Sequence, residues 1–303
     1  MATQPVSAPS GGVKLPSPLL ILGCGFVGSH LARRAVAEGV RVLATARDSA
    51  GVARLREIGV EVVADTPDAI DETLLASCCA IVDSIPLVRS GDGWSPPQLG
   101  WVEYLVASSP HLRWVGYLSS TSVYADAQGA WVDEVSATLA QSGRGLQRLR
   151  AERCWQEATA VVEIFRLSGI YGPGRNLIAR LQQGDYRAVV WNPPHFSNRI
   201  HVDDIVSALL AAMAAPQRGR VVNVSDDLPL PHMQYVQELA QLTGCAPPLL
   251  LSAEEAEERC SAGYLAFFQD NKRISNRRLH RELLPVLRYP SFRSAVSTLM
   301  ADV

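Results

Sequence analysis

The chain has 303 residues, 48% of them apolar, which is enough for one large domain or for a domain with a smaller lobe. Its formal net charge of −2 gives no indication that the protein binds nucleic acid or a membrane surface. No apolar run reaches the roughly 18 residues of a membrane span. The six cysteines include no Cys-x-x-Cys pair, which argues against a zinc site or a disulfide framework and for a reducing, cytoplasmic compartment.

Residues 1–17 are rich in Ser, Pro, Ala and Gly, and Lys14 is the only charged residue among them. This composition predicts a disordered leader. The segment has neither the arginines of a transit peptide nor the apolar run of a signal peptide, so neither kind of targeting segment is predicted.

A run of four apolar residues at 19–22 predicts a strand that is buried on both faces. A Gly-x-Gly-x-x-Gly motif follows at Gly23, Gly25 and Gly28, and then a helix that a glycine ends at Gly39. Strand, glycines and helix in this order match the context that the dinucleotide-binding fingerprint requires. We therefore favour a dinucleotide site over a glycine-rich turn without a ligand.

Each glycine of this motif has a predicted role. Gly23 turns the chain sharply off the strand, Gly25 leaves room for a pyrophosphate beside the backbone, and Gly28 lets the helix pack closely on the strand. The free N–H groups at the start of the helix, at Phe26 and Val27, are expected to hold the anion, because the helix dipole is positive there.

Residues 40–46 predict a second strand, and the residues at its end bear on the cofactor. Folds that prefer NAD carry an acidic residue there, which binds the ribose 2′-hydroxyl. This chain has Ala46 and Arg47 instead, and a guanidinium can bind a 2′-phosphate, with Thr45 adding a hydroxyl. The residues thus favour NADP over NAD. The alternative is that Arg47 is a solvated loop cation, which Asp48 neutralises.

Helices and strands continue to alternate over the next part of the chain. The expected elements are a helix at 49–58, a strand at 60–64, a helix near 71–78, a strand at 80–82, a helix near 98–108 and a strand at 114–118. Such an alternation predicts a parallel sheet with helices on both faces. Residues 89–97 are expected to form a turn-rich loop at the carboxyl end of a strand, where open α/β sheets place functional groups.

Four later stretches carry a family resemblance. Residues 119–124 read Ser-Ser-x-x-Val-Tyr, and residues 166–174 read Arg-x-x-x-Ile-Tyr-Gly-Pro-Gly. Residues 201–204 read His-Val-Asp-Asp, and residues 222–227 resemble a strand that precedes C-terminal helices. In this order they resemble the extended short-chain dehydrogenase/reductases, the NAD-dependent epimerase/dehydratase superfamily, over about residues 18–300.

The resemblance implies an α/β fold, a Rossmann-type doubly wound parallel sheet with a smaller C-terminal substrate lobe. It implies a dinucleotide-binding domain at 18–165 and a mixed substrate lobe at 166–303, from which a helix at 202–214 returns to the main sheet. It also implies a homodimer through the helices near 98–108 and 142–158.

The acid–base pair of that family, a Tyr-x-x-x-Lys on a helix, is missing from this chain. The matching positions hold Arg144 and Arg148, and neither of the two lysines, Lys14 and Lys272, follows a tyrosine at that spacing. Arginine stays protonated at any working pH, so Arg144 cannot exchange a proton as the tyrosine does. Arg148 can still supply positive charge and hydrogen bonds to a ribose.

The predicted catalytic residues are Ser120, Tyr124 and Arg144. Ser120 takes the position of the family's catalytic serine. Ser120, Ser122 and Tyr124 are spaced by two, so an extended chain would place all three on one face. Tyr124 is then either a substitute acid, assisted by the cation of Arg144, or a residue that packs under a loop. Arg144 would also favour an anionic small-molecule substrate.

Asp65, at the end of the strand at 60–64, has two interpretations. The resemblance places it at the adenine, whose amino group can donate to a carboxylate; the alternative is a turn residue that caps the next segment. The predicted cofactor-binding residues are Gly23, Gly25, Phe26, Val27, Gly28, Arg47, Asp65 and Arg148, and no metal ligands are predicted.

Two functions fit these observations. The first is an NADP-dependent oxidoreductase or epimerase that acts on a small polar or sugar-like substrate, and Ser120 favours it. The second is a non-catalytic NADP-binding protein, a sensor or scaffold, and the missing tyrosine and lysine favour it. Both use the glycine motif, because a binding site can persist on a fold without its chemistry.

Overall fold

The computed structural model describes residues 14–91, 93–138, 143–184 and 186–301. Residues 1–13 of the expected leader lie outside the described residues. In the part of the chain that is described, no helix is both long enough and apolar enough to cross a membrane.

A seven-stranded parallel sheet forms the centre of the fold, in the order β14-β9-β7-β4-β1-β2-β3. Its strands are β1 (Leu19–Leu22), β2 (Val42–Thr45), β3 (Glu61–Ala64), β4 (Ala80–Asp83), β7 (Trp114–Ser120), β9 (Val162–Leu167) and β14 (Val221–Val224). The strand order runs outward in both directions from β1 and β4, so the switch point of the sheet lies between these two strands. Open α/β sheets bind ligands at such a point, beyond the carboxyl ends of the strands.

Apolar residues on β1 explain why this strand lies in the middle. All four of its side chains are fully buried. Leu19 and Ile21 belong to one apolar core, and Leu20 and Leu22 belong to another. Because successive side chains of a strand point to opposite faces, an unbroken apolar run needs cover on both.

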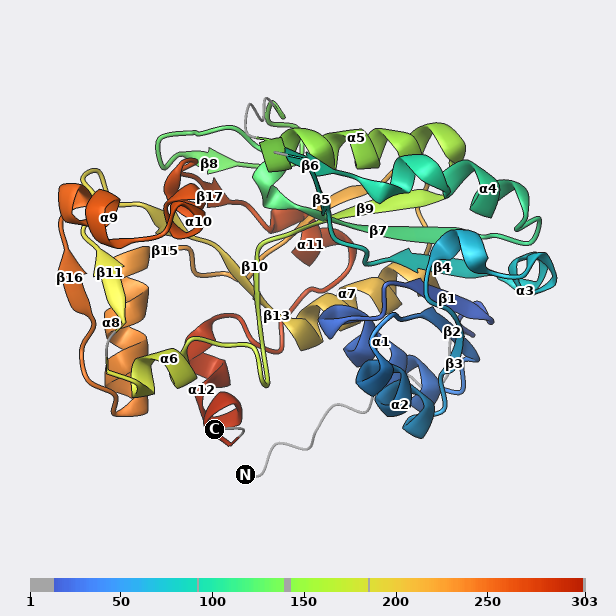
Figure 1. Ribbon diagram of the computed structural model, residues 1–303, viewed down its shortest axis with the longest axis horizontal. Coiled ribbons are helices and arrows are strands. Elements are labelled where there is room, and N and C mark those ends of the chain that lie inside the picture. Colours follow the sequence, from blue (N-terminus) through green and yellow to red (C-terminus); the bar gives the residue numbers. More distant parts are fainter. Residues whose placement is uncertain (1–13, 92, 139–142, 185, 302–303) are drawn as a thin grey trace, which may run out of the picture.

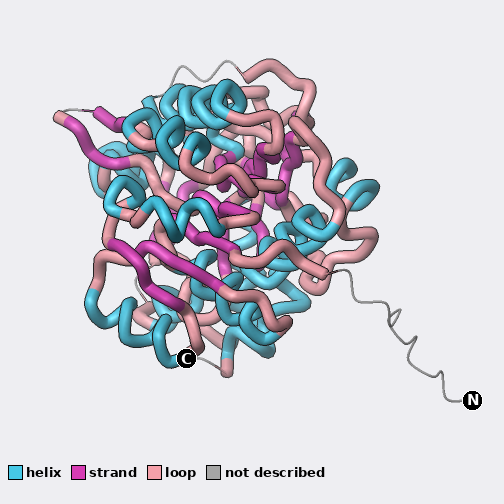
Figure 2. The backbone as a smooth tube through the Cα atoms, turned by 90° about the vertical axis from the view of Figure 1, so that its right-hand side faces the viewer, coloured by secondary structure: helices cyan, strands magenta, loops and turns pink. Residues whose placement is uncertain are grey.

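Helices provide this cover, as Figure 1 shows. The core on one face includes residues of α1 (Phe26–Ala37), α2 (Ser49–Glu57), α7 (Val202–Ala214) and α11 (Arg277–Glu282). The core on the other face includes residues of α3 (Glu72–Ser77), α4 (Val102–Ala107) and α5 (Gly143–Ala158). In the view of Figure 2, helices are drawn above and below the strands in the middle of the molecule. The predicted doubly wound α/β fold is therefore confirmed.

The remaining chain forms a smaller part, drawn on the left of Figure 1. Its elements are β10 (Gly169–Tyr171), α6 (Ile178–Gln182), β11 (Arg187–Val189), β12 (Phe196–Ser197), β13 (Arg199–His201), β15 (Leu230–Pro231), α8 (His232–Thr243), β16 (Leu249–Leu251), α9 (Ala253–Arg259), α10 (Ala262–Leu265) and α12 (Phe292–Met300). The helices α6, α8 and α12 enclose a third apolar core. The predicted domain boundary at residue 166 falls within β9 and stays a prediction.

Residues 89–97 differ from the predicted loop. They contain most of an antiparallel hairpin of β5 (Val88–Ser90) and β6 (Gly93–Ser95), followed by the 3-10 turn η2 (Pro97–Gly100). Each strand has only three residues, and the β5 residues are all exposed, so the segment lacks the apolar alternation that predicts a strand. Two short strands elsewhere, β8 (Trp131–Val132) and β17 (Arg273–Ile274), also pair with each other.

Candidate functional site

The glycine loop between β1 and α1 is tied to the end of β2. The N–H of Gly23 donates to Oγ1 of Thr45 over 2.8 Å, and the N–H of Cys24 donates to the Thr45 carbonyl over 2.9 Å. Gly23 has a φ of +69°, which a side chain would strain. Thr45 is buried and its hydroxyl supports the loop, and its expected contact with a 2′-phosphate stays a prediction.

The start of α1 is open to an anion. Gly25 precedes the helix, and no side chain caps it. The first intrahelical bond runs from the N–H of Ser29 to the Gly25 carbonyl, so the N–H groups of Phe26, Val27 and Gly28 have no partner within the helix. A Cβ added at Gly25 would meet its nearest atom at 3.9 Å, whereas one at Gly28 would lie 3.1 Å from Ile21. The backbone thus leaves space above Gly25 and fits closely at Gly28.

Two charged residues follow the next two strands of the sheet after β1, at the same carboxyl edge as the glycine loop. Arg47 follows β2 and Asp65 follows β3, and both are exposed. Asp48 does not pair with Arg47 among the described residues: it accepts from the N–H of Gly51 over 2.7 Å to cap α2, and lies 3.7 Å from Arg54. Arg47 is therefore free of the neutralising carboxylate that the alternative interpretation requires.

Ser120 ends β7 and caps the 3-10 turn η3 (Thr121–Val123). Its Oγ accepts from the N–H of Ser122 over 3.2 Å. The expectation of an extended chain with Ser120, Ser122 and Tyr124 on one face is therefore wrong. A serine side chain can hydrogen-bond the backbone two residues on, and here this local bond favours the turn over a continued strand.

Tyr124 is fully buried below this turn. Its hydroxyl donates to Oδ1 of Asn223 over 2.7 Å and accepts from Nη1 of Arg166 over 3.0 Å. Burial raises the pKa of Tyr124, and the charge of Arg166 only partly offsets this. Arg166 in turn forms a buried ion pair with Glu152 over 2.8 Å. These contacts favour the packing role of Tyr124 over that of a substitute acid.

Arg148, at the position of the family's lysine, is held at the carboxyl ends of two strands. Its Nη1 donates to the Tyr117 hydroxyl over 3.0 Å, to the Leu118 carbonyl over 3.3 Å and to the Ile85 carbonyl over 3.5 Å. Tyr117 and Leu118 lie on β7, two or three residues before Ser120. The guanidinium is thus anchored beside the switch point of the sheet.

Arg144 lies one helical turn before Arg148 on α5 and contacts the β5–β6 hairpin. Its guanidinium lies 4.2 Å from the centre of the Trp94 ring, and that of Arg89 lies 5.0 Å from the same centre. Neither arginine appears in an ion pair of the described residues. The two guanidinium groups on one indole concentrate positive charge at this hairpin. The sequence predicted function for this segment but did not single out Trp94 or Arg89.

Asp83 is a further residue that the sequence analysis missed. It is fully buried at the end of β4 and accepts from the N–H of Ile85 over 2.9 Å, from Gln98 over 2.9 Å and from Trp155 over 2.8 Å. Burial raises its pKa, and these hydrogen bonds only partly oppose that rise. A Cβ at Gly23 would lie 2.7 Å from Ile85. Asp83 therefore positions the segment that packs against the glycine loop.

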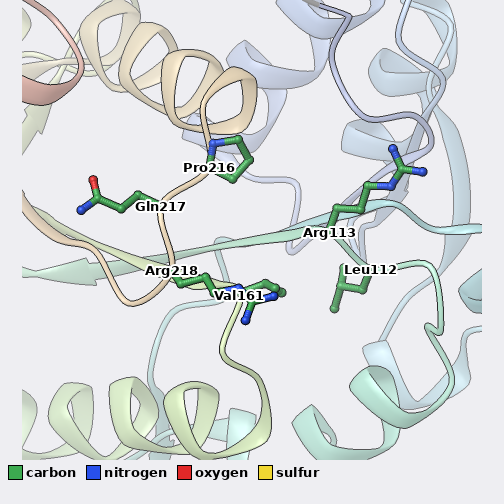
Figure 3. A pocket seen from close by; sticks show the side chains of 6 residues that line it. All are labelled: Leu112, Arg113, Val161, Pro216, Gln217 and Arg218. Carbon is green, nitrogen blue, oxygen red and sulfur yellow. The ribbon is translucent and has the colours of Figure 1, made fainter.

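One hollow of the structure lies away from this site. It has a volume of about 340 Å³ and is lined by Leu112, Arg113, Val161, Pro216, Gln217 and Arg218 (Figure 3). These residues precede β7, β9 and β14, so the hollow is at the amino ends of the strands, opposite the glycine loop. No cluster of three His, Cys, Asp or Glu side chains that could hold a metal ion occurs within the described ranges.

Comparison with known proteins adds two close matches. No family model matches the chain. Over 242 residues it is 30% identical to Protein YeeZ of Escherichia coli, covering 75% of this chain and 84% of that protein. A functionally unknown conserved protein from Silicibacter pomeroyi DSS has a solved structure that is 34% identical, with a TM-score of 0.83 over 94% of this chain and 98% of that chain.

More distant solved structures share the fold. UDP-glucuronic acid 4-epimerase from Bacillus cereus, in complex with NAD, is 15% identical with a TM-score of 0.72, over 94% of this chain and 96% of that chain. The human epimerase family protein SDR39U1, with NADPH, is 15% identical with a TM-score of 0.73, over 94% of this chain and 100% of that chain. The structural neighbours are thus proteins of the NAD-dependent epimerase/dehydratase family.

Proposed function

We propose that this chain, which belongs to the family of Protein YeeZ, is a nicotinamide-dinucleotide-dependent oxidoreductase of the atypical short-chain dehydrogenase/reductase type. Its substrate is a small anionic carbonyl or hydroxyl compound. The observation that carries the proposal is the uncapped start of α1 below the open space at Gly25. That arrangement fits a pyrophosphate, and the fold neighbours were solved with NAD or NADPH.

In this proposal a dinucleotide, when bound, exchanges a hydride with the substrate. Ser120 binds the substrate oxygen: its Oγ accepts from the Ser122 N–H, which leaves its own proton free to donate. The fixed charge of Arg148 stabilises negative charge on that oxygen. Arg144 and Arg89 hold the anionic part of the substrate. The proton of the product comes from solvent, because arginine does not release one.

Binding is tested by titration with NADPH, NADP, NADH and NAD. The variant Gly25→Val should lose binding, because its side chain fills the space for the pyrophosphate, while thermal unfolding without ligand stays near that of the parent. Gly263→Val on α10 is the matched control, since it adds the same side chain far from the glycine loop. Equal affinity of Gly25→Val and the parent would refute the proposed site.

A non-catalytic dinucleotide-binding protein is the second candidate. The observation that favours it is the buried hydroxyl of Tyr124, whose bonds to Asn223 and Arg166 occupy the tyrosine that could have replaced the family's proton donor. Turnover of NADPH with a panel of anionic and neutral carbonyl compounds separates the two. The oxidoreductase predicts turnover that falls at least about tenfold in Ser120→Ala and in Arg144→Ala, but not in the exposed-helix control Arg150→Ala. Binding without turnover of any compound would establish the second candidate.

A further inference from the structure

A tight turn from the second half of the chain packs against the start of α1. In this turn the N–H of Gly172 donates to the Arg175 carbonyl, and the N–H of Arg175 donates to the Gly172 carbonyl, both over 3.0 Å. A Cβ at Gly172 would lie 2.7 Å from Val202 and 3.4 Å from the Phe26 ring. The turn is therefore fixed between the first residue of α7 and the first residue of α1.

Arg175 extends from this turn to the glycine loop. Its guanidinium carbon lies 5.3 Å from the centre of the Phe26 ring. The side chain is exposed, and the ion pairs formed by the described residues do not include it. Phe26 is also the residue whose backbone N–H begins α1 and has no partner in the helix. A guanidinium with no ion-pair partner among the described residues thus stacks on the side chain of the residue that begins α1.

The glycine loop has no charge of its own with which to balance a pyrophosphate. Residues 19–32 contain no Lys, Arg, Asp or Glu. Their one histidine, His30, has its pKa lowered by partial burial, so it is neutral at neutral pH. The helix start supplies about half an elementary charge, less than the two negative charges that a pyrophosphate carries. A cation from another segment would strengthen the binding of the pyrophosphate, and Arg175 lies close enough to the glycine loop to provide it.

We propose that Arg175 is a cofactor-binding residue, whose guanidinium binds the pyrophosphate oxygens of the dinucleotide held on α1. The anion is then bound between the glycine loop and the Gly172–Arg175 turn, so the second half of the chain contributes directly to cofactor binding. In the absence of an anion the guanidinium rests on the Phe26 ring as a cation–π contact. This inference rests on the proposed dinucleotide site and adds a residue to it.

The test compares Arg175→Gln with Arg180→Gln. Arg180 is the matched control, because it lies five residues further on, is exposed, and stacks on Tyr186 at 4.8 Å. Affinities are measured for NADPH, NADH and ADP-ribose, which all contain the pyrophosphate. Arg175→Gln should weaken each by about tenfold to a hundredfold, the range for charge-assisted hydrogen bonds, while Arg180→Gln matches the parent. Arg175→Lys should recover part of the loss, because it keeps the charge without the paired donors.

The salt dependence of binding and the Gly25→Val variant distinguish a failure of this inference from a failure of the proposed function. The difference in ligand affinity between the parent and Arg175→Gln should decrease as the salt concentration rises from about 50 mM to about 500 mM, because the contact is electrostatic. Unchanged affinity in Arg175→Gln, with binding still lost in Gly25→Val, would overturn this inference and leave the proposed site intact. A parent protein that binds none of the three ligands would overturn the proposed function and this inference with it. Thermal unfolding without ligand confirms that each variant is folded.

Discussion

Arg47 is the residue to which we assign the proposed preference for NADP over NAD. Asp48, its neighbour, caps α2 through Gly51 and lies near Arg54, and in the part of the chain that is described it forms no ion pair with Arg47. No acidic side chain occupies the position that would bind the 2′-hydroxyl of NAD. The side chain that would add a hydroxyl, Thr45, is used by the glycine loop. We therefore assign the proposed preference for NADP to Arg47.

We expect NADPH to bind more tightly than NADH, and Arg47→Ala to weaken NADPH by about tenfold or more, as the loss of a charge-assisted hydrogen bond to phosphate predicts. NADH affinity should change little, because NADH has no phosphate at that position. Arg56→Ala removes an exposed cation from α2 and is the control for general electrostatics. Calorimetric titration of both ligands into the three proteins measures the effect. Equal affinity of the parent for NADPH and NADH would contradict it.

At the scale of elements, the central sheet and its first helices could be predicted because their signals are local. An unbroken apolar run predicts a buried strand, and the glycine motif predicts the turn and helix that follow β1. The β5–β6 hairpin and the η3 turn escaped prediction for the opposite reason. The hairpin has strands of only three residues, and η3 is capped by the Ser120 hydroxyl, which accepts from the Ser122 N–H. Such features are decided by single contacts rather than by a pattern.

The candidate site also has parts that local sequence predicts and parts that it does not. Its glycine loop and the position of Arg47 follow from residues that are adjacent in sequence. The contacts of Arg175 with Phe26 and of Arg144 with Trp94 join segments that are far apart, and no local pattern announces them. Tyr124 is the clearest case. Its spacing from Ser120 favoured a shared face, but the partners that hold its hydroxyl, Arg166 and Asn223, come from later strands.

At the scale of the whole molecule, polar contacts attach the C-terminal segment to the body of the fold. Nζ of Lys272 donates to the Tyr124 carbonyl over 2.9 Å, next to the serine turn. The carboxylate of Asp204, at the start of α7, accepts from the N–H groups of Arg288 and Tyr289. The segment thus helps to hold both the turn that presents Ser120 and the helix that packs on α1. The homodimer through α4 and α5 stays a prediction.

A further polar contact of the C-terminal segment, between His280 and Asp227, should depend on pH. Nε2 of His280, on α11, lies 2.7 Å from Oδ1 of Asp227, and its Nδ1 lies 2.9 Å from the Leu284 carbonyl. Burial alone would lower the pKa of His280, but the hydrogen bond and charge of Asp227, with the carbonyls of Leu284 and Pro285, outweigh burial and raise it. Both ring nitrogens then act as donors, which only the protonated imidazole can do.

A raised pKa in the folded state means that protonated His280 stabilises the fold below the pKa of the unfolded chain, about 6.5, and that this contribution disappears as pH rises through the folded value. Replacing the imidazole with an amide in His280→Gln removes the titration. We therefore expect the parent to exceed His280→Gln in free energy of unfolding by more at about pH 5.5 than at about pH 8.5. Urea unfolding of both proteins at the two pH values measures this difference of differences, in which the titration of other groups cancels. A gap that is the same at both pH values, or larger at the higher one, would show that the His280–Asp227 pair does not hold the C-terminal segment through its charge.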